Sequence, residues 1–126
     1  MAHMDIALRK AALLFEGAIG MALVDADNGV TLGALGGSSD FDLTAAATGN
    51  AELLRTIKRT AGRLGLTGSV EDILITLNTQ YHLIRPLTSR SNGGLFLYLA
   101  LDRRSANLAM ARHQLVSIEG QLSPVW

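Results

Sequence analysis

The chain has 126 residues, 48% of them hydrophobic, and its 11 basic and 11 acidic residues give a formal net charge of zero. A chain of this length suits one compact domain, and area scaling predicts that about two-thirds of its surface is buried on folding. The balanced charge excludes a global attraction to nucleic acid or anionic membrane, and the absence of cysteine excludes disulfides, thiolate catalysis and cysteine-based metal sites.

The sequence predicts one domain, with no targeting signal and no membrane helix. Residues 1–4 resemble a cloning scar, which places the expected native start at Met4. The longest apolar run falls far short of the ~20 residues that a membrane helix needs, and no segment satisfies the pattern of a targeting signal, so we expect a cytoplasmic protein. A single domain is predicted over residues 5–122, followed by a short tail over 123–126.

A helix and a hairpin are predicted first. Residues 5–16 place apolar side chains largely along one side at helical spacing. Residues 19–25 and 30–35 form two apolar runs, and Asn28–Gly29 between them is the favoured centre of a type I′ turn, which predicts a β-hairpin. Small residues in these strands favour the close approach of a helix to one face: Gly20, Ala22 and Gly33.

A long helix is predicted next, over residues 42–64. Its apolar side is expected to contain Leu53, Leu54, Ile57, Ala61 and Leu64. Its opposite arc carries the one concentration of charge in the chain: Arg55, Lys58, Arg59 and Arg63. Such an arc is most often a solvated helix face, and the functional alternative is a docking face for an acidic surface on a partner.

Three strands and a last helix complete the chain. Residues 73–78 alternate, with Ile73, Ile75 and Leu77 on one face, which is typical of a half-buried edge strand. Residues 81–87 form the next strand, in which Pro86 belongs near an end, and residues 95–101 are apolar throughout, as in a central strand. Asp102 is then expected to cap the final helix. The order α-β-β-α-β-β-β-α predicts an α+β fold: a five-stranded antiparallel sheet with helices on both faces.

No motif predicts catalysis, a metal or a cofactor. In the segment that begins Asp25–Gly29, glycine stands at the fifth position of a would-be calcium loop, where the sixth is required. Residues 33–39 lack the spacing of a dinucleotide fingerprint and the Lys-Ser/Thr of a P-loop. His82 and His113 are not at metal-ligand spacing. We therefore nominate no catalytic residue and expect a protein that is not an enzyme.

Taken together, three segments resemble one family. The glycine-rich stretch Gly17–Asp25, the run from Asp72–Thr76 into Tyr81–Arg85, and the segment Leu101–Arg112 are similar to the Roadblock, or dynein light-chain-like, domains. Such domains are also found in bacteria and archaea beside Ras-like small GTPases. The resemblance covers residues 5–122. One difference is that many GTPase-associated bacterial members begin with a longer helix than the segment before Gly17 allows.

The resemblance implies a homodimer that regulates a small GTPase, or serves as its scaffold, without hydrolysing anything itself. It implies that the strand at 73–78 pairs with its twin and that the helices at 42–64 of two subunits lie side by side. The dimer residues are then Leu54, Ile57, Ala61, Ile73, Leu74, Ile75, Thr76 and Leu77. The partner-binding residues are Arg55, Lys58, Arg59 and Arg63, of which Arg55 or Arg59 could approach a nucleotide as an arginine finger.

Two alternatives to this function remain open at the level of the sequence. The small residues Gly20, Ala22 and Gly33 could leave room for a ligand between the layers of a small-molecule-sensing domain. The chain could instead be one subunit of a mixed Roadblock-type heterodimer. The identity of the GTPase and its nucleotide state are not encoded in any pattern of the sequence.

Overall fold

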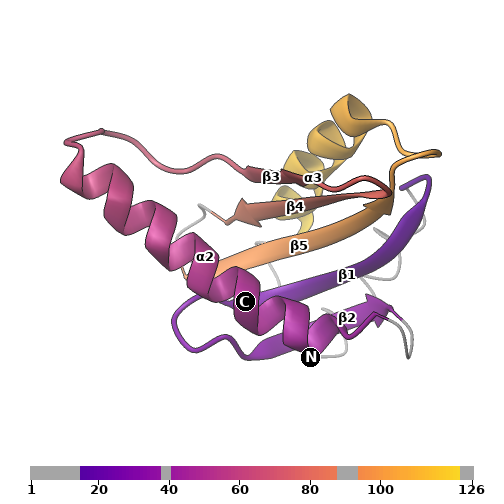
Figure 1. Ribbon diagram of the computed structural model, residues 1–126, viewed down its shortest axis with the longest axis horizontal. Coiled ribbons are helices and arrows are strands. Elements are labelled where there is room, and N and C mark those ends of the chain that lie inside the picture. Colours follow the sequence, from indigo (N-terminus) through magenta and orange to yellow (C-terminus); the bar gives the residue numbers. More distant parts are fainter. Residues whose placement is uncertain (1–14, 38–40, 88–93, 123–126) are drawn as a thin grey trace.

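The computed structural model describes residues 15–37, 41–87 and 94–122 (Figure 1). In chain order the elements are β1 (Ala18–Asp25), β2 (Thr31–Gly36), α2 (Leu43–Arg63), β3 (Ile73–Thr76), β4 (Gln80–Pro86), β5 (Leu95–Asp102) and α3 (Leu108–Leu122). The helix predicted over 5–16 lies outside the described residues up to position 14, and Phe15 and Glu16 lie in a turn. None of the described helices is long and apolar enough to cross a membrane.

The strands form one antiparallel sheet in the order β2-β1-β5-β4-β3, which confirms the predicted α+β class and its five-stranded sheet. β5 is central and is buried from Phe96 to Leu101, as its unbroken apolar run predicts. β2 and β3 are the two edges, so the edge character predicted for the third strand is confirmed.

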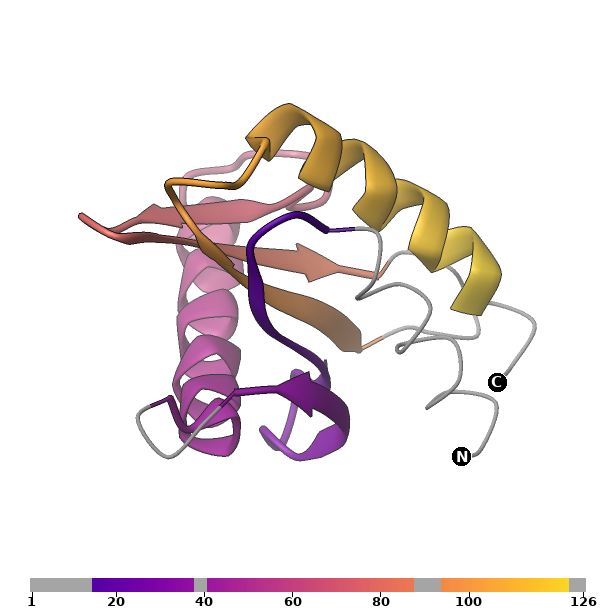
Figure 2. The ribbon, with the colours of Figure 1, turned by 90° about the vertical axis from the view of Figure 1, so that its right-hand side faces the viewer.

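The two helices cover opposite faces of the sheet, as Figure 2 shows. Alternate residues of β5 therefore enter different cores. Phe96, Tyr98 and Ala100 pack with the buried side of α2, together with Leu43, Ala47, Ala51 and Leu54. Leu97, Leu99 and Leu101 pack with Ala111, Leu115 and Ile118 of α3.

The start of α2 is fixed by a cap and by a close contact with β1. The Asp42 carboxylate accepts a hydrogen bond from the Ala45 N–H at 3.1 Å, which satisfies one of the free amides of the first turn. A Cβ atom at Gly20 would lie 2.9 Å from a methyl carbon of Leu43, so only glycine lets the helix sit this close without a rearrangement. The small residue in β1 thus serves the close helix approach that the sequence predicts.

The β1–β2 hairpin forms, but its turn is not of type I′. That turn needs positive φ at both central residues, and no non-glycine residue among those described has positive φ. The connection is a longer loop in which Gly29 adopts φ 75° and the Asn28 side chain accepts a hydrogen bond from the Val30 N–H at 2.8 Å. Asn28 contributes through this side-chain turn and not through a left-handed backbone.

The predicted cap of the last helix is also wrong. Asp102 is the final residue of β5, where its N–H donates to the Gly17 carbonyl at 2.7 Å. The chain then needs a turn to leave the sheet and reverse across its face. α3 starts only at Leu108, and the Asn107 side chain accepts from the Met110 N–H at 3.0 Å.

The backbone conformation at the end of β2 can be tested by substitution of Gly36. Gly36 has φ 80°, and a Cβ atom there would lie 2.6 Å from the Ile19 carbonyl oxygen. We expect Gly36→Ala to destabilise the protein by about 2–3 kcal/mol, through backbone strain and the clash, measured by urea denaturation. Gly49→Ala is the matched control. A Cβ there meets nothing within 4 Å in a helix, so it should stabilise by about 0.5–1 kcal/mol. Equal stabilities of the two variants would contradict the fold at this edge.

Candidate partner-binding surface

Only the first half of α2 is packed against the sheet. Its buried residues are Leu43, Ala47, Ala51 and Leu54, and no later residue of the helix is buried. In Figure 1 the C-terminal half of α2 runs out past the ends of the strands before the chain returns to β3. The second half of the helix, from Arg55 to Arg63, is therefore a projecting arm with most of its surface open.

The arm carries three exposed cations. Lys58, Arg59 and Arg63 are exposed, and among them Arg59 makes one side-chain contact, to the Thr56 hydroxyl at 3.3 Å. Glu52 is the only acidic residue within α2. The surface is thus locally basic although the chain as a whole is neutral.

Arg55, the fourth predicted cation, has a different role. Its guanidinium donates to the backbone carbonyl of Ala26 and also to that of Asp27, at 3.4 Å. Both acceptors lie in the loop between β1 and β2, and the side chain is only partly exposed. Arg55 therefore ties α2 to the β1–β2 loop, so the structure separates it from the three exposed cations.

Apolar side chains accompany the cations. Leu64 and Leu66, which follow α2, are 69% and 63% exposed, and Ile57 is also exposed. These exposures differ from the expectation that Ile57 and Leu64 lie on a covered side, because the sheet ends before it reaches them. Beside them is a concavity of about 410 Å³ lined by the end of α2, the following loop and the end of β4.

The predicted dimer residues fall into two groups. Leu54, on the side of α2 that packs against the sheet, is 0% exposed and has no surface left for contact with a second protomer. Ala61 and residues 73–75 are partly buried, whereas Ile57, Thr76 and Leu77 are exposed. Leu77 lies just after β3, because the strand ends at Thr76, two residues earlier than predicted.

The backbone of β3 offers hydrogen bonds along its free edge. The Leu77 N–H donates to the Gln80 carbonyl at 2.9 Å, and Ile75 and Thr76 lie opposite His82 and Tyr81. Hydrogen-bonded pairs alternate with non-bonded pairs in an antiparallel ladder, so Ile75 bonds inward to β4. Leu74 and Thr76 then direct their N–H and C=O groups away from β4. No strand of the described residues pairs with this side.

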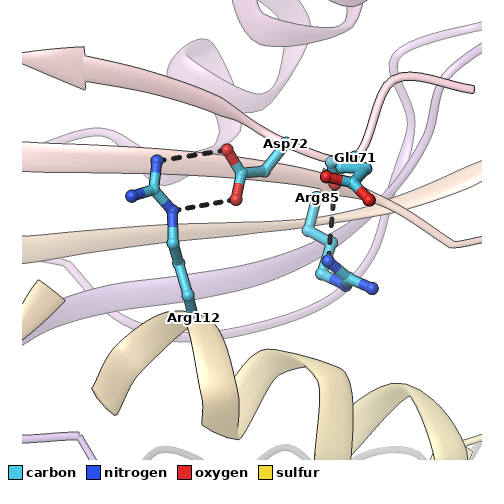
Figure 3. Close-up of polar contacts among 4 residues, drawn as sticks. All are labelled: Glu71, Asp72, Arg85 and Arg112. Carbon is cyan, nitrogen blue, oxygen red and sulfur yellow. Dashed lines mark hydrogen bonds and ion pairs between the residues drawn. The ribbon is translucent and has the colours of Figure 1, made fainter. Parts of the chain in front are cut away.

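An ion pair and a hydrogen bond hold the two residues that precede β3 (Figure 3). Arg112 of α3 donates two hydrogen bonds to the Asp72 carboxylate, from Nε at 3.0 Å and from a second nitrogen at 3.3 Å. Such a bidentate ion pair fixes the relative geometry of the two side chains. Arg85 of β4 reaches the Glu71 carbonyl at 3.5 Å, and its Nε lies 3.4 Å from the Glu119 carboxylate. The residues just before the edge strand are therefore held in place by contacts from both α3 and β4.

The two histidines in the described residues have different surroundings. His82 is partly buried and contacts Tyr98 and Gln80, while His113 is exposed on α3. Among the described residues, no three His, Cys, Asp or Glu side chains lie close enough together to hold a metal ion. The contact of His82 with Tyr98 is not visible in the sequence, because the two residues lie 16 positions apart on paired strands.

Comparison with protein-family models finds no match, and comparison with curated protein sequences finds none. Solved structures do match. A Roadblock/LC7 domain from Streptomyces avermitilis has a TM-score of 0.82 at 16% identity, covering 96% of this chain and 95% of that one. The gliding protein MglB of Thermus thermophilus gives 0.78 at 16%, covering 98% and 88%, and Myxococcus xanthus MglB gives 0.75 at 18%, covering 98% and 84%. The chain therefore has a Roadblock-like fold.

The tie made by Arg55 leads to a stability prediction. Removal of a charged donor from two backbone carbonyls should cost about 1–3 kcal/mol in Arg55→Ala, measured by urea denaturation. Lys58→Ala is the control, because an exposed cation without such contacts should change stability by less than about 0.5 kcal/mol. If the two variants were equally stable, Arg55 would belong with the exposed cations after all.

Proposed function

We propose that this protein is a non-enzymatic regulator or scaffold that binds a Ras-like small GTPase and works as a homodimer. The observation that carries the proposal is the projecting arm of α2 with its exposed cations, together with the exposed Leu64 and Leu66 that follow it and a β3 edge that no other described strand pairs with. Similarity in fold to two bacterial MglB proteins supports the same assignment.

The dimer is supported by the free edge of β3. An edge strand exposes unpaired backbone groups, and proteins usually blunt it with Lys, Pro or a covering segment. β3 has the sequence Ile-Leu-Ile-Thr, without either residue. A second copy that pairs with the outward groups of Leu74 and Thr76 would satisfy them and would bring the two α2 arms together. Ile57 and Ala61 then face the second helix, with Leu54 supporting them from beneath.

The GTPase is supported by the charge of the arm. Lys58, Arg59 and Arg63 favour a partner with an acidic surface, since complementary charge speeds association and excludes wrong partners. Of the two arginines considered for contact with a nucleotide, Arg59 is the better placed, because Arg55 is occupied by the β1–β2 loop.

The alternatives fare differently. The room for a small ligand expected at Gly20 is filled by the Leu43 side chain, and Ala22 is fully buried in the same core. This packing gives the ligand-sensing alternative no support. A mixed Roadblock heterodimer would use the same edge and arm as the homodimer, so it is distinguished by the partner and not by the surface.

The test is a binding titration against the Ras-like GTPases of the source organism, each loaded with GDP or with a non-hydrolysable GTP analogue. We expect binding to one of them with an affinity that depends on the nucleotide. Absence of binding in both states for all of them would overturn the GTPase assignment, while mass measurements would still report on the dimer.

The basic arm can be tested by charge reversal. Lys58→Glu combined with Arg59→Glu should weaken GTPase binding by more than about tenfold, because two attractive contacts become repulsive. Arg104→Glu, at a highly exposed cation in the turn between β5 and α3, is the control and should leave the affinity unchanged. Equal loss in both variants would mean a general charge effect and not a docking face.

The dimer can be tested without disturbing the ladder inside the protomer. Thr76→Pro removes an outward N–H, whereas Ile75→Pro would break a bond to β4. We expect Thr76→Pro to be monomeric by light scattering, with a secondary-structure content by circular dichroism equal to that of its control. That control is Thr76→Val, which keeps the N–H and should remain dimeric. A dimeric Thr76→Pro protein would remove strand pairing as the interface.

A further inference from the structure

A chain of hydrogen bonds lies in the sheet directly beneath α2. The Tyr98 hydroxyl of β5 lies 3.0 Å from Nδ1 of His82 on β4, and Nε2 of the same ring lies 2.7 Å from the Gln80 side-chain oxygen. Tyr98 packs in one core with Ala47, Ala51 and Leu54 of α2. We refer to Tyr98, His82 and Gln80 as the α2–sheet relay.

The direction of the bonds in the relay is determined by its two ends. The Gln80 oxygen can only accept, so Nε2 of His82 carries the proton and Nδ1 is left as an acceptor. The Tyr98 O–H then donates to Nδ1. Every donor has an acceptor, provided that the imidazole is neutral.

The surroundings favour that neutral state. The Phe41 ring, just before α2, meets the imidazole edge-on with centroids 5.7 Å apart, and Ile75 of β3 is the register partner of His82. Tyr98 is the titratable group in contact with the ring. None of the ion pairs found among the described residues involves His82. Burial lowers the pKa of His82, and burial raises the pKa of Tyr98 to about 12.

Protonation of His82 removes the acceptor of the buried Tyr98 hydroxyl. Both ring nitrogens become donors, so Nδ1–H and the Tyr98 O–H then oppose each other. The Tyr98 O–H must turn away from His82, within the core that α2 covers. Tyr98 is fully buried, so water does not replace the lost partner, and an unsatisfied buried group is costly.

We propose that the α2–sheet relay is a pH-sensitive switch: proton uptake by His82 loosens the seat of α2 on the sheet. Because α2 carries the exposed arm, acidification alters the presentation of that surface. The relay lies within one protomer, so the proposal does not depend on which partner binds the arm or on whether the chain dimerises.

The direction in which pH changes the stability follows from the linkage between proton binding and folding. A histidine with a lowered folded-state pKa binds its proton more readily in the unfolded chain. The folding equilibrium constant is therefore highest above the unfolded pKa of about 6.5, and it falls as the pH drops from there toward the folded-state pKa of His82. One proton allows a fall of at most about tenfold per pH unit.

The test compares the wild-type chain with His82→Gln between pH 8 and pH 5. Glutamine retains a donor and an acceptor but does not titrate in this range. Urea denaturation of the wild-type protein should show stability falling below about pH 6.5, and His82→Gln should lose this component. His113→Gln, at the exposed histidine of α3, should retain it. Equal pH slopes for wild type and His82→Gln would overturn the proposal.

Two further measurements separate the switch from a merely structural histidine. Hydrogen exchange of α2 amides, corrected for intrinsic rates, should be faster at pH 5.5 than at pH 7.5 in the wild type but not in His82→Gln. NMR titration of Tyr98→Phe, which lacks the hydroxyl, should raise the midpoint of proton uptake by His82 relative to the wild type. An unchanged midpoint would show that Tyr98 does not control the ring. This second variant keeps the test open if His82→Gln fails to fold.

Discussion

The seating of α2 on β1 and β5 is the constraint on which the other features depend. Gly20 admits the first turn of the helix, Asp42 fixes where that turn begins, and Ala47 and Ala51 keep the next turns close to the sheet. A helix of 21 residues is about 30 Å long, whereas its buried residues end at Leu54. The projecting arm is therefore the direct result of a helix longer than the face it covers.

The two faces of the sheet are stabilised differently. On the α3 side, Asp72 with Arg112 and Glu119 with Arg85 use charge to fix the position of the edge strand. On the α2 side, the contact is made by apolar residues, many of them small, above a relay of neutral groups in the sheet. Neutral hydrogen bonds in such a buried layer respond to the gain of one proton. The helix with the open surface is thus the one whose seat is sensitive to pH.

The fold was predictable because its signals are local. The unbroken apolar run of β5, the alternation of β3 and the helical spacing of apolar residues after Asp42 each identify an element from a few neighbouring residues, and the sheet and α2 formed as expected. The turn after Asp25 and the start of α3 were predicted wrongly, since side-chain turns and the path off the sheet decide them. The roles of the surface residues were harder still to predict from the sequence. Arg55 looks like its neighbours Lys58 and Arg59 on a helical arc, and only the arrangement in space brings it to a loop 29 residues away.

The projecting arm also separates two properties of the protein. Residues that stabilise the core lie in the first half of α2, and the exposed residues of the arm contribute almost nothing to it. Substitutions at distant, independent sites usually have additive effects on stability, so changes at Lys58, Arg59 or Arg63 leave the folding free energy nearly untouched. In the partner-binding role that we propose for the arm, sequence drift can therefore alter the choice of partner while the domain remains folded. A fold of this kind can diverge into several specificities from one unchanged core.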